Sequence, residues 1–340
     1  MDTAEPARTY NQRHVARPYT PGRRRISLYW TWSYAWEAQR DVAVLDNRFS
    51  TMTEVRNVLW PQYETPEWSA ANFLQGIDGT LELFHRSTLS FQRLAEEVSG
   101  HAVAVFQRVD QAGFPLPIDE RILADTDTLM VFGLDHLLCE QAAAPGEVAA
   151  IRQWLQREGT CLLIAPHHDV GFTDDLEQRQ MEHLHHADPL APRQQRFGAY
   201  TRSLIAALGV PVHNVWGLRP ALAAGTRDIA PLKTFRDLDT LGLLADVPTL
   251  AFHPHLPHYE LTGAEAAAIH VLAQQPVDLT RPHPFTQAGA TEFNSLLWMP
   301  PQGERAGDIL VMDSTHFTTL FGGTGSLANF WRNLATMRCR

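Results

Sequence analysis

Short apolar runs alternate with helical patterns along much of the chain. Residues 26–30 predict a short strand. Continuous apolar runs at residues 128–133 and 161–165 predict buried strands, and the second of these runs is typical of a strand buried on both faces. Between the last two runs, residues 145–158 carry apolar side chains at the spacing of an amphipathic helix. Strand–helix alternation of this kind predicts an α/β fold with a doubly wound, mostly parallel sheet.

The same patterns extend the prediction to the rest of the chain. They indicate helices at 79–98, 193–208, 262–274 (with Thr262 as N-cap) and 326–337, and strands at 101–109, 247–252, 293–298 and 309–312. Residues 1–24 are polar and contain several prolines, which is typical of an N-terminal arm. We therefore expect a single domain at 25–340 with insertions near 31–78 and 166–192.

The charge distribution argues against nucleic acid as a partner. The formal net charge is −10, and the one concentrated basic run is Arg23–Arg25. This run directly precedes an apolar strand, so we interpret it as a solvated approach to that strand.

Cysteine usage and hydropathy favour a cytoplasmic protein without a membrane partner. The three cysteines show neither paired nor metal-ligand spacing, which is typical of a reducing compartment. The N-terminus has no apolar signal region, and no window approaches 18 apolar residues.

Three segments together are similar to one known superfamily. They are DTDTLMVFGLDHLL with PGEVAAIRQWLQREGTCLLIAPHHD, then HPFTQAGATEFNSLLW, and GDILVMDSTHFTTLFGGTGSLANFWRNLATM. In this order they resemble the class I glutamine amidotransferase-like superfamily, particularly its trehalose-utilisation (ThuA-like) branch, over roughly 101–170 and 282–338. The resemblance implies a flavodoxin-like, amidotransferase-like sheet, and its ThuA-like members imply a sugar-derived substrate.

The chain departs from this superfamily at the nucleophile. Where the glutamine amidotransferases carry a cysteine between two glycines, this sequence has Ala165-Pro166-His167-His168-Asp169. Cys161 lies within the preceding apolar strand, where we expect a buried and unreactive thiol. Glutaminase chemistry is therefore not expected.

The sixteen histidines fall partly into groups. The groups lie at 167–168, 183–186, 253–258 and 316, and three of the four follow predicted strands. Ligands of open α/β sheets collect at the carboxyl ends of strands, so these three groups should share one edge.

Imidazole and carboxylate groups at one edge predict a divalent metal site. The candidate ligands are His167, His168, Asp169, His253 and His255. The two members of His253-x-His255 should point to one face, whereas adjacent His167 and His168 diverge, so that only one of them joins the site. Zinc is the expected metal, with iron or manganese as alternatives. We interpret 183–186, in a polar insertion, as solvated surface, and its role stays open.

Further side chains could bind or transform a substrate. Trp30, Trp32 and Trp36 follow the first strand and could stack on a sugar ring, although they could equally form an ordinary aromatic cluster over the sheet. Glu37, or His316 with Asp313 after the last strand, could act as general acid or base.

Two classes of function follow. The first is a metal-dependent hydrolase or lyase acting on a small polar substrate, a sugar derivative or an amide. The alternative is a non-catalytic ligand-binding or assembly module on an amidotransferase-like fold. A non-haem iron enzyme with two histidines and a carboxylate is a further alternative. The sequence leaves open whether the chain forms a homo-oligomer.

Overall fold

The computed structural model describes residues 17–33, 36, 84–110, 113–187, 194–250, 253, 255–319 and 325–337. Its strands are β1 (Ile26–Trp30), β2 (Ala104–Gln107), β3 (Thr128–Gly133), β4 (Cys161–Pro166), β5 (Asp169–Val170), β6 (Gln195–Arg196), β7 (Val212–Leu218), β8 (Lys233–Thr234), β9 (Leu256–Leu261), β10 (His270–Pro276), β11 (Glu292–Met299) and β12 (Asp308–Met312). Its α-helices are α5 (Leu89–Ser99), α6 (Glu120–Leu123), α7 (Pro145–Trp154), α8 (Leu176–His186), α9 (Ala199–Leu208), α10 (Pro284–Gln287) and α11 (Leu327–Thr336).

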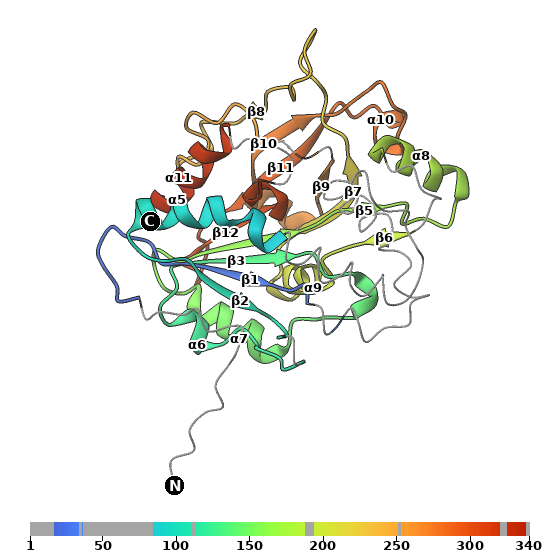
Figure 1. The fold of residues 1–340 in the computed structure, drawn as a ribbon. Coiled ribbons are helices and arrows are strands. Elements are labelled where there is room, and N and C mark those ends of the chain that lie inside the picture. Colours follow the sequence, from blue (N-terminus) through green and yellow to red (C-terminus); the bar gives the residue numbers. More distant parts are fainter. Residues whose placement is uncertain are drawn as a thin grey trace, which may run out of the picture.

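An eight-stranded sheet forms the centre of the molecule (Figure 1). Its strand order is β2-β1-β3-β4-β12-β11-β10-β8. The pairs from β2 to β12 are parallel, and the pairs from β12 to β8 are antiparallel. The predicted α/β fold with a mostly parallel sheet is confirmed.

Helices cover both faces of this sheet (Figure 1). Because strand side chains alternate between faces, β3 sends Met130 and Phe132 to one side and Leu129 and Val131 to the other. The first face packs against α5 and α11, and the second against α6, α7 and α9. Both sides of the parallel strands are therefore buried, which explains why most of their residues are apolar.

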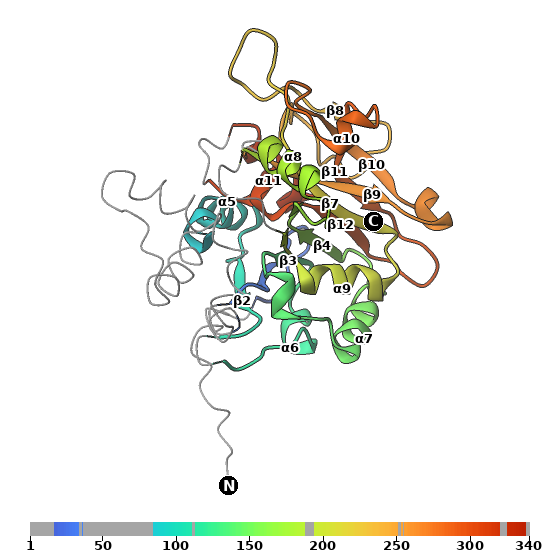
Figure 2. The same ribbon diagram turned by 90° about the vertical axis from the view of Figure 1, so that its right-hand side faces the viewer.

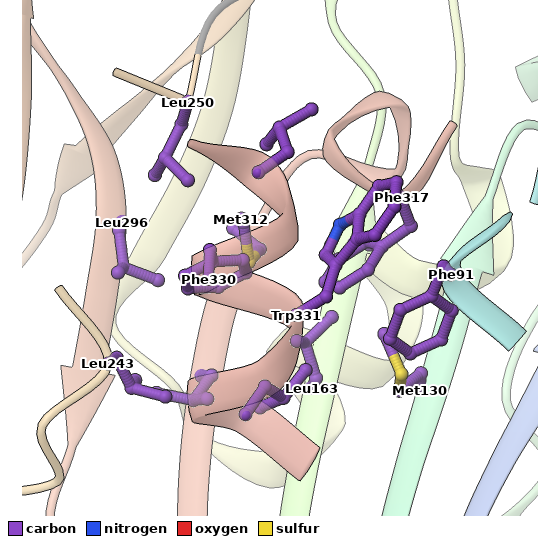
Figure 3. Packing of buried hydrophobic residues seen from close by; sticks show 14 of the residues in the cluster. Phe91, Met130, Leu163, Leu243, Leu250, Leu296, Met312, Phe317, Phe330 and Trp331 are labelled. Atoms are coloured by element: carbon purple, nitrogen blue, oxygen red, sulfur yellow. The ribbon is translucent and has the colours of Figure 1, made fainter. Parts of the chain in front are cut away.

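Helix α11 anchors the segment that follows β12. Phe330 and Trp331 are buried on the sheet with Phe317 and Met312 (Figure 3). The indole N–H of Trp331 donates a hydrogen bond to the carbonyl of His316 at 2.8 Å. The terminal helix thus fixes the short 3-10 helix that carries the residues after β12.

Two predicted elements are wrong. Residues 262–274 form a 3-10 helix (Ala264–Ala268), capped by Gly263 and not by Thr262, followed by β10. Pairing of β10 with β11 outweighs the helix propensity of the alanine-rich stretch.

Residues 247–250 form no strand, and 251–252 lie outside the described residues. Val247 and Leu250 are nevertheless buried, which accounts for the apolar pattern.

The interpretation of the arginine run as solvated is wrong for two of its members. Arg24 donates hydrogen bonds to the carbonyls of Met337 and Gly159, and Arg25 forms an ion pair with Asp127 at 2.7 Å. Both arginines are buried, because they join backbone and carboxylate acceptors at the start of the sheet.

Cys161 is buried within β4, as expected for a core thiol. No helix in the described part of the chain combines the length and apolarity needed to cross a bilayer.

Candidate metal centre

Two of the predicted groups lie together at the carboxyl edge of the parallel strands. His167 and His168 follow β4, and Asp313 follows β12. Strands β4 and β12 pair in parallel, so both segments leave the sheet at the same edge. The prediction that the histidine groups follow strands at one edge of the sheet is confirmed for these two groups. It is wrong for 253–258, because His253 and His255 precede β9.

Three histidines from separate elements converge beside this edge. His168 follows β4, His186 ends α8, and His255 precedes β9. One nitrogen from each ring lies within 4.8 Å of the other two. The Nε2 atoms of His168 and His186 are 2.8 Å apart, and the rings of His186 and His255 stack with centroids 3.5 Å apart. We call His168, His186 and His255 the three-histidine cluster.

Helix α8 brings His186 to this cluster. Asp175 caps the helix by accepting hydrogen bonds from the backbone N–H groups of Glu177 and Gln178, and the helix ends at Ala187. The helix lies beside β7 (Figures 1 and 2). Its last turn is directed toward the protein interior, and His186 is only 5% exposed.

The interpretation of 183–186 as solvated surface is wrong. His183, His185 and His186 are all buried, because α8 packs its last turn against the protein. His185 donates from Nδ1 to the carbonyl of Arg281 and accepts at Nε2 from the backbone N–H of Arg219. Both nitrogens of His185 are therefore satisfied, whereas His186 belongs to the cluster.

Gly217 in β7 provides the space that the rings occupy. A β-carbon at this position would lie 2.4 Å from Cδ2 of His168 and 2.9 Å from Cδ2 of His186. The register of β7 with β9 shifts between Val215 and Gly217. Only glycine leaves room for the two imidazoles at this point of the strand.

Burial of the cluster disfavours the charged form of two of its imidazoles. Burial lowers the pKa of His168 and His255 well below its ordinary value, and the neighbouring histidines lower it further. The Nδ1 atoms of His168 and His255 are buried and have no hydrogen-bond partner among the described residues. Neutral imidazoles with unpartnered nitrogens are costly in a protein interior, and they are the form that binds metal ions.

His167 turns away from the cluster toward a carboxylate. Its Nδ1 lies 3.1 Å from Oδ1 of Asp313, whose other oxygen accepts from the hydroxyl of Thr315 at 2.5 Å. Burial alone would raise the pKa of Asp313, but His167 and Thr315 hold it below its usual range. Only one of the adjacent histidines thus joins the cluster, which is the divergence expected from the sequence.

Asp169 is not placed as a metal ligand. Its carboxylate forms ion pairs with Arg202 at 2.5 Å and with Arg196 at 3.4 Å. Burial raises the pKa of Asp169 to about 7, although both arginines act in the opposite direction. Its oxygens are engaged by guanidinium groups, so Asp169 lies outside the three-histidine cluster, and its role as a ligand stays a prediction.

His253 lies next to the cluster without being part of it. Its ring centroid is 4.0 Å from that of His255, so the expected proximity of the pair is present. Its Nδ1 lies 2.6 Å from the carbonyl oxygen of His255. Burial, followed by the neighbouring His167, lowers the pKa of His253 to about 3.

The residues predicted to bind a substrate or to act as acid or base lie in different surroundings from one another. Trp30 and Trp32 are buried in the core, so they belong to the aromatic cluster over the sheet and present no face to a sugar. Trp36 is partly exposed, and Glu37 lies outside the described residues. His316 is buried in the 3-10 helix after Asp313.

Comparison with known proteins finds no family model and no curated protein that matches this chain.

Proposed function

We propose that the three-histidine cluster binds a divalent metal ion, with zinc as the preferred metal, and that the protein is a metal-dependent hydrolase of a small polar substrate. The observation that carries this proposal is the convergence of His168, His186 and His255 in a buried position at the sheet edge. Three imidazoles with an open fourth position are a ligand set of catalytic zinc sites.

A purely structural role for these rings is harder to reconcile with their contacts. At the 2.8 Å contact between His168 and His186, only one nitrogen can carry the shared proton. His255 stacks on His186 and adds another neutral imidazole without a partner at Nδ1. A cation between the rings would replace the shared proton as the partner of the facing Nε2 atoms of His168 and His186.

The donor set favours zinc over the alternatives. Imidazole nitrogens suit zinc, whereas magnesium, calcium and manganese prefer oxygen ligands. The non-haem iron alternative requires a carboxylate beside two histidines, and Asp169 is occupied by Arg202 and Arg196. The cluster thus supports zinc hydrolysis better than iron redox chemistry.

A bound zinc ion would lower the pKa of its water toward neutrality and polarise a substrate carbonyl.

The parallel block β2-β1-β3-β4-β12 has the 2-1-3-4-5 strand order of flavodoxin-like sheets. This order supports the proposed kinship with the amidotransferase-like superfamily, with His167-His168 at the position of the missing nucleophile. A sugar derivative or an amide is the substrate class that this kinship favours.

The proposal is tested by hydrolysis of nitrophenyl esters, nitroanilides and nitrophenyl glycosides. We expect the zinc-loaded protein to cleave at least one of these substrates, and we expect chelator treatment to abolish cleavage and added zinc to restore it. His186→Ala should be inactive under the same conditions. Metal binding without hydrolysis of any substrate would instead support a non-catalytic binding module.

A further inference from the structure

A second pocket is formed by residues of β6, α9 and β7, and none of the cluster histidines lines it. Its volume is about 270 Å³. Ile205, Val210 and Val212 are buried and give the pocket an apolar wall, whereas Arg196 and Arg202 supply two guanidinium groups. Small-molecule sites typically have this character, with mostly apolar walls and a few polar groups that fix the orientation of the ligand.

Arg202 is held in a fixed position at this pocket. Its Nε donates to the carbonyl of Phe197 at 2.9 Å, and one of its Nη atoms donates to the carbonyl of Asn214 at 2.7 Å. The other Nη atom pairs with the carboxylate of Asp169 at 2.5 Å. Burial lowers the pKa of Arg202 to about 10, so its guanidinium stays charged at neutral pH. A fixed and poorly hydrated positive charge therefore lines the pocket.

Arg196 lies at the same pocket with donors available. Its guanidinium carbon lies 4.7 Å from the centroid of the Phe172 ring, and stacking on an aromatic face leaves the in-plane N–H groups free to donate. Its Nε is buried without a hydrogen-bond partner among the described residues, at 3.4 Å from a carboxylate oxygen of Asp169. An acceptor in the pocket would satisfy this guanidinium.

The charges of the two arginines are not balanced. In the described part of the chain, Asp169 is the acidic side chain that forms an ion pair with either of them. Two guanidinium groups beside one carboxyl leave at least one positive charge uncompensated, whatever the ionisation of that carboxyl. An uncompensated charge is costly away from bulk water, so a bound anion would stabilise this arrangement.

We propose that this pocket binds a small organic monocarboxylate, whose carboxylate is bound by Arg196 beside the fixed charge of Arg202. The planar fork of an arginine matches the two oxygens of a carboxylate. Asp169 would repel the second charge of a phosphate dianion, and the apolar wall accommodates the uncharged part of an organic acid. The pocket volume of about 270 Å³ is just below the roughly 300–1,000 Å³ of drug-sized sites, so the ligand is small.

Calorimetric titration with benzoate and with benzamide, its uncharged isostere, tests this site. We expect the wild type to bind benzoate saturably and benzamide roughly tenfold more weakly or worse. Arg196→Gln should bind benzoate roughly ten- to a hundredfold more weakly, the loss expected when a charged hydrogen-bond donor is removed. Arg227→Gln is the matched control, because it removes the same charge from an exposed position outside the pocket.

Arg196→Lys separates the guanidinium fork from its charge. Lysine keeps the positive charge without the paired donors, so this variant should bind benzoate more weakly than the wild type and more tightly than Arg196→Gln. If Arg196→Gln does not fold, Arg196→Lys decides the question, and wild-type affinity in this variant would then overturn the inference.

Zinc can itself bind a carboxylate, so the metal site supplies the discriminating arm. His186 does not line the pocket, and His186→Ala should therefore bind benzoate like the wild type. Loss of benzoate binding in His186→Ala, with wild-type affinity in Arg196→Gln, would place the carboxylate on the metal and overturn the inference. A wild type that binds no benzoate, or that binds benzamide equally well or inorganic phosphate more tightly, would also overturn it. A protein that takes up no zinc but binds benzoate through Arg196 would overturn the proposed function alone.

Discussion

Substitution of His186 by alanine is expected to lower the affinity for zinc by roughly 100- to 1,000-fold. Binding free energies of protein zinc sites with about four ligands are of order 10–16 kcal/mol, so that one ligand accounts for about 3 kcal/mol. His186 contacts both other members of the cluster, with Nε2 at 2.8 Å from that of His168 and its ring stacked on His255. Its removal therefore leaves two ligands at most. Competition with a fluorescent zinc chelator measures the change.

The exposed His213 on β7 supplies the control. His213→Ala should bind zinc like the wild type, which shows that the loss is specific to the cluster. Thermal unfolding of the metal-free His186→Ala protein separates a loss of ligand from a loss of fold. Wild-type zinc affinity in a folded His186→Ala protein would exclude His186 as a ligand.

Glu147→Gln is expected to reduce the free energy of unfolding by about 3 kcal/mol at neutral pH, as is typical when one partner of a buried ion pair is removed. Glu147 is 2% exposed and pairs with Arg108 at 2.6 Å. It also accepts from the hydroxyl of Tyr200 and from the backbone N–H groups of Ile118 and Ala144. Glutamine would place an N–H where at least one of these donors now points, and it would leave the Arg108 charge without a partner. Denaturant unfolding measures the loss.

The same carboxylate predicts a pH dependence. Burial alone would raise the pKa of Glu147, but the hydrogen bond and charge of Arg108 hold it below the ordinary value of 4.5. The unfolded chain therefore binds the proton more readily, so this contribution is fully present above about pH 5 and is lost as the pH falls through the folded-state pKa. The stability difference between wild type and Glu147→Gln should shrink on acidification. A constant difference would contradict this account, and exposed Glu158→Gln should show no such effect.

The central strands were predictable because their sequences encode burial directly. The runs that became β1, β3 and β4 are mostly apolar, and their apolar side chains face one or the other helical layer. The error at 262–274 has the opposite origin. An alanine-rich stretch favours a helix locally. Residues of β10 nevertheless form a strand because they pair with β11, which lies outside the stretch of sequence that the local pattern covers.

The candidate site was predictable in part for a similar reason. His168 and Asp313 directly follow strands, and the geometry of a parallel sheet places such residues on one edge. His186 was missed because the polar insertion around it was interpreted as solvated. Asp175 as an N-cap before the charged first turn of α8 was the available signal for a helix. The approach of α8 to β7 depends on tertiary packing, which no local pattern reports.

The most direct test of the central claim is the metal content of untagged protein, measured by inductively coupled plasma mass spectrometry after purification without chelator. The convergence of His168, His186 and His255 predicts about one zinc ion per chain, lost with His186→Ala and retained with His213→Ala. A wild-type protein that contains no metal and takes up none from added zinc would contradict the account, and its histidines would then be structural.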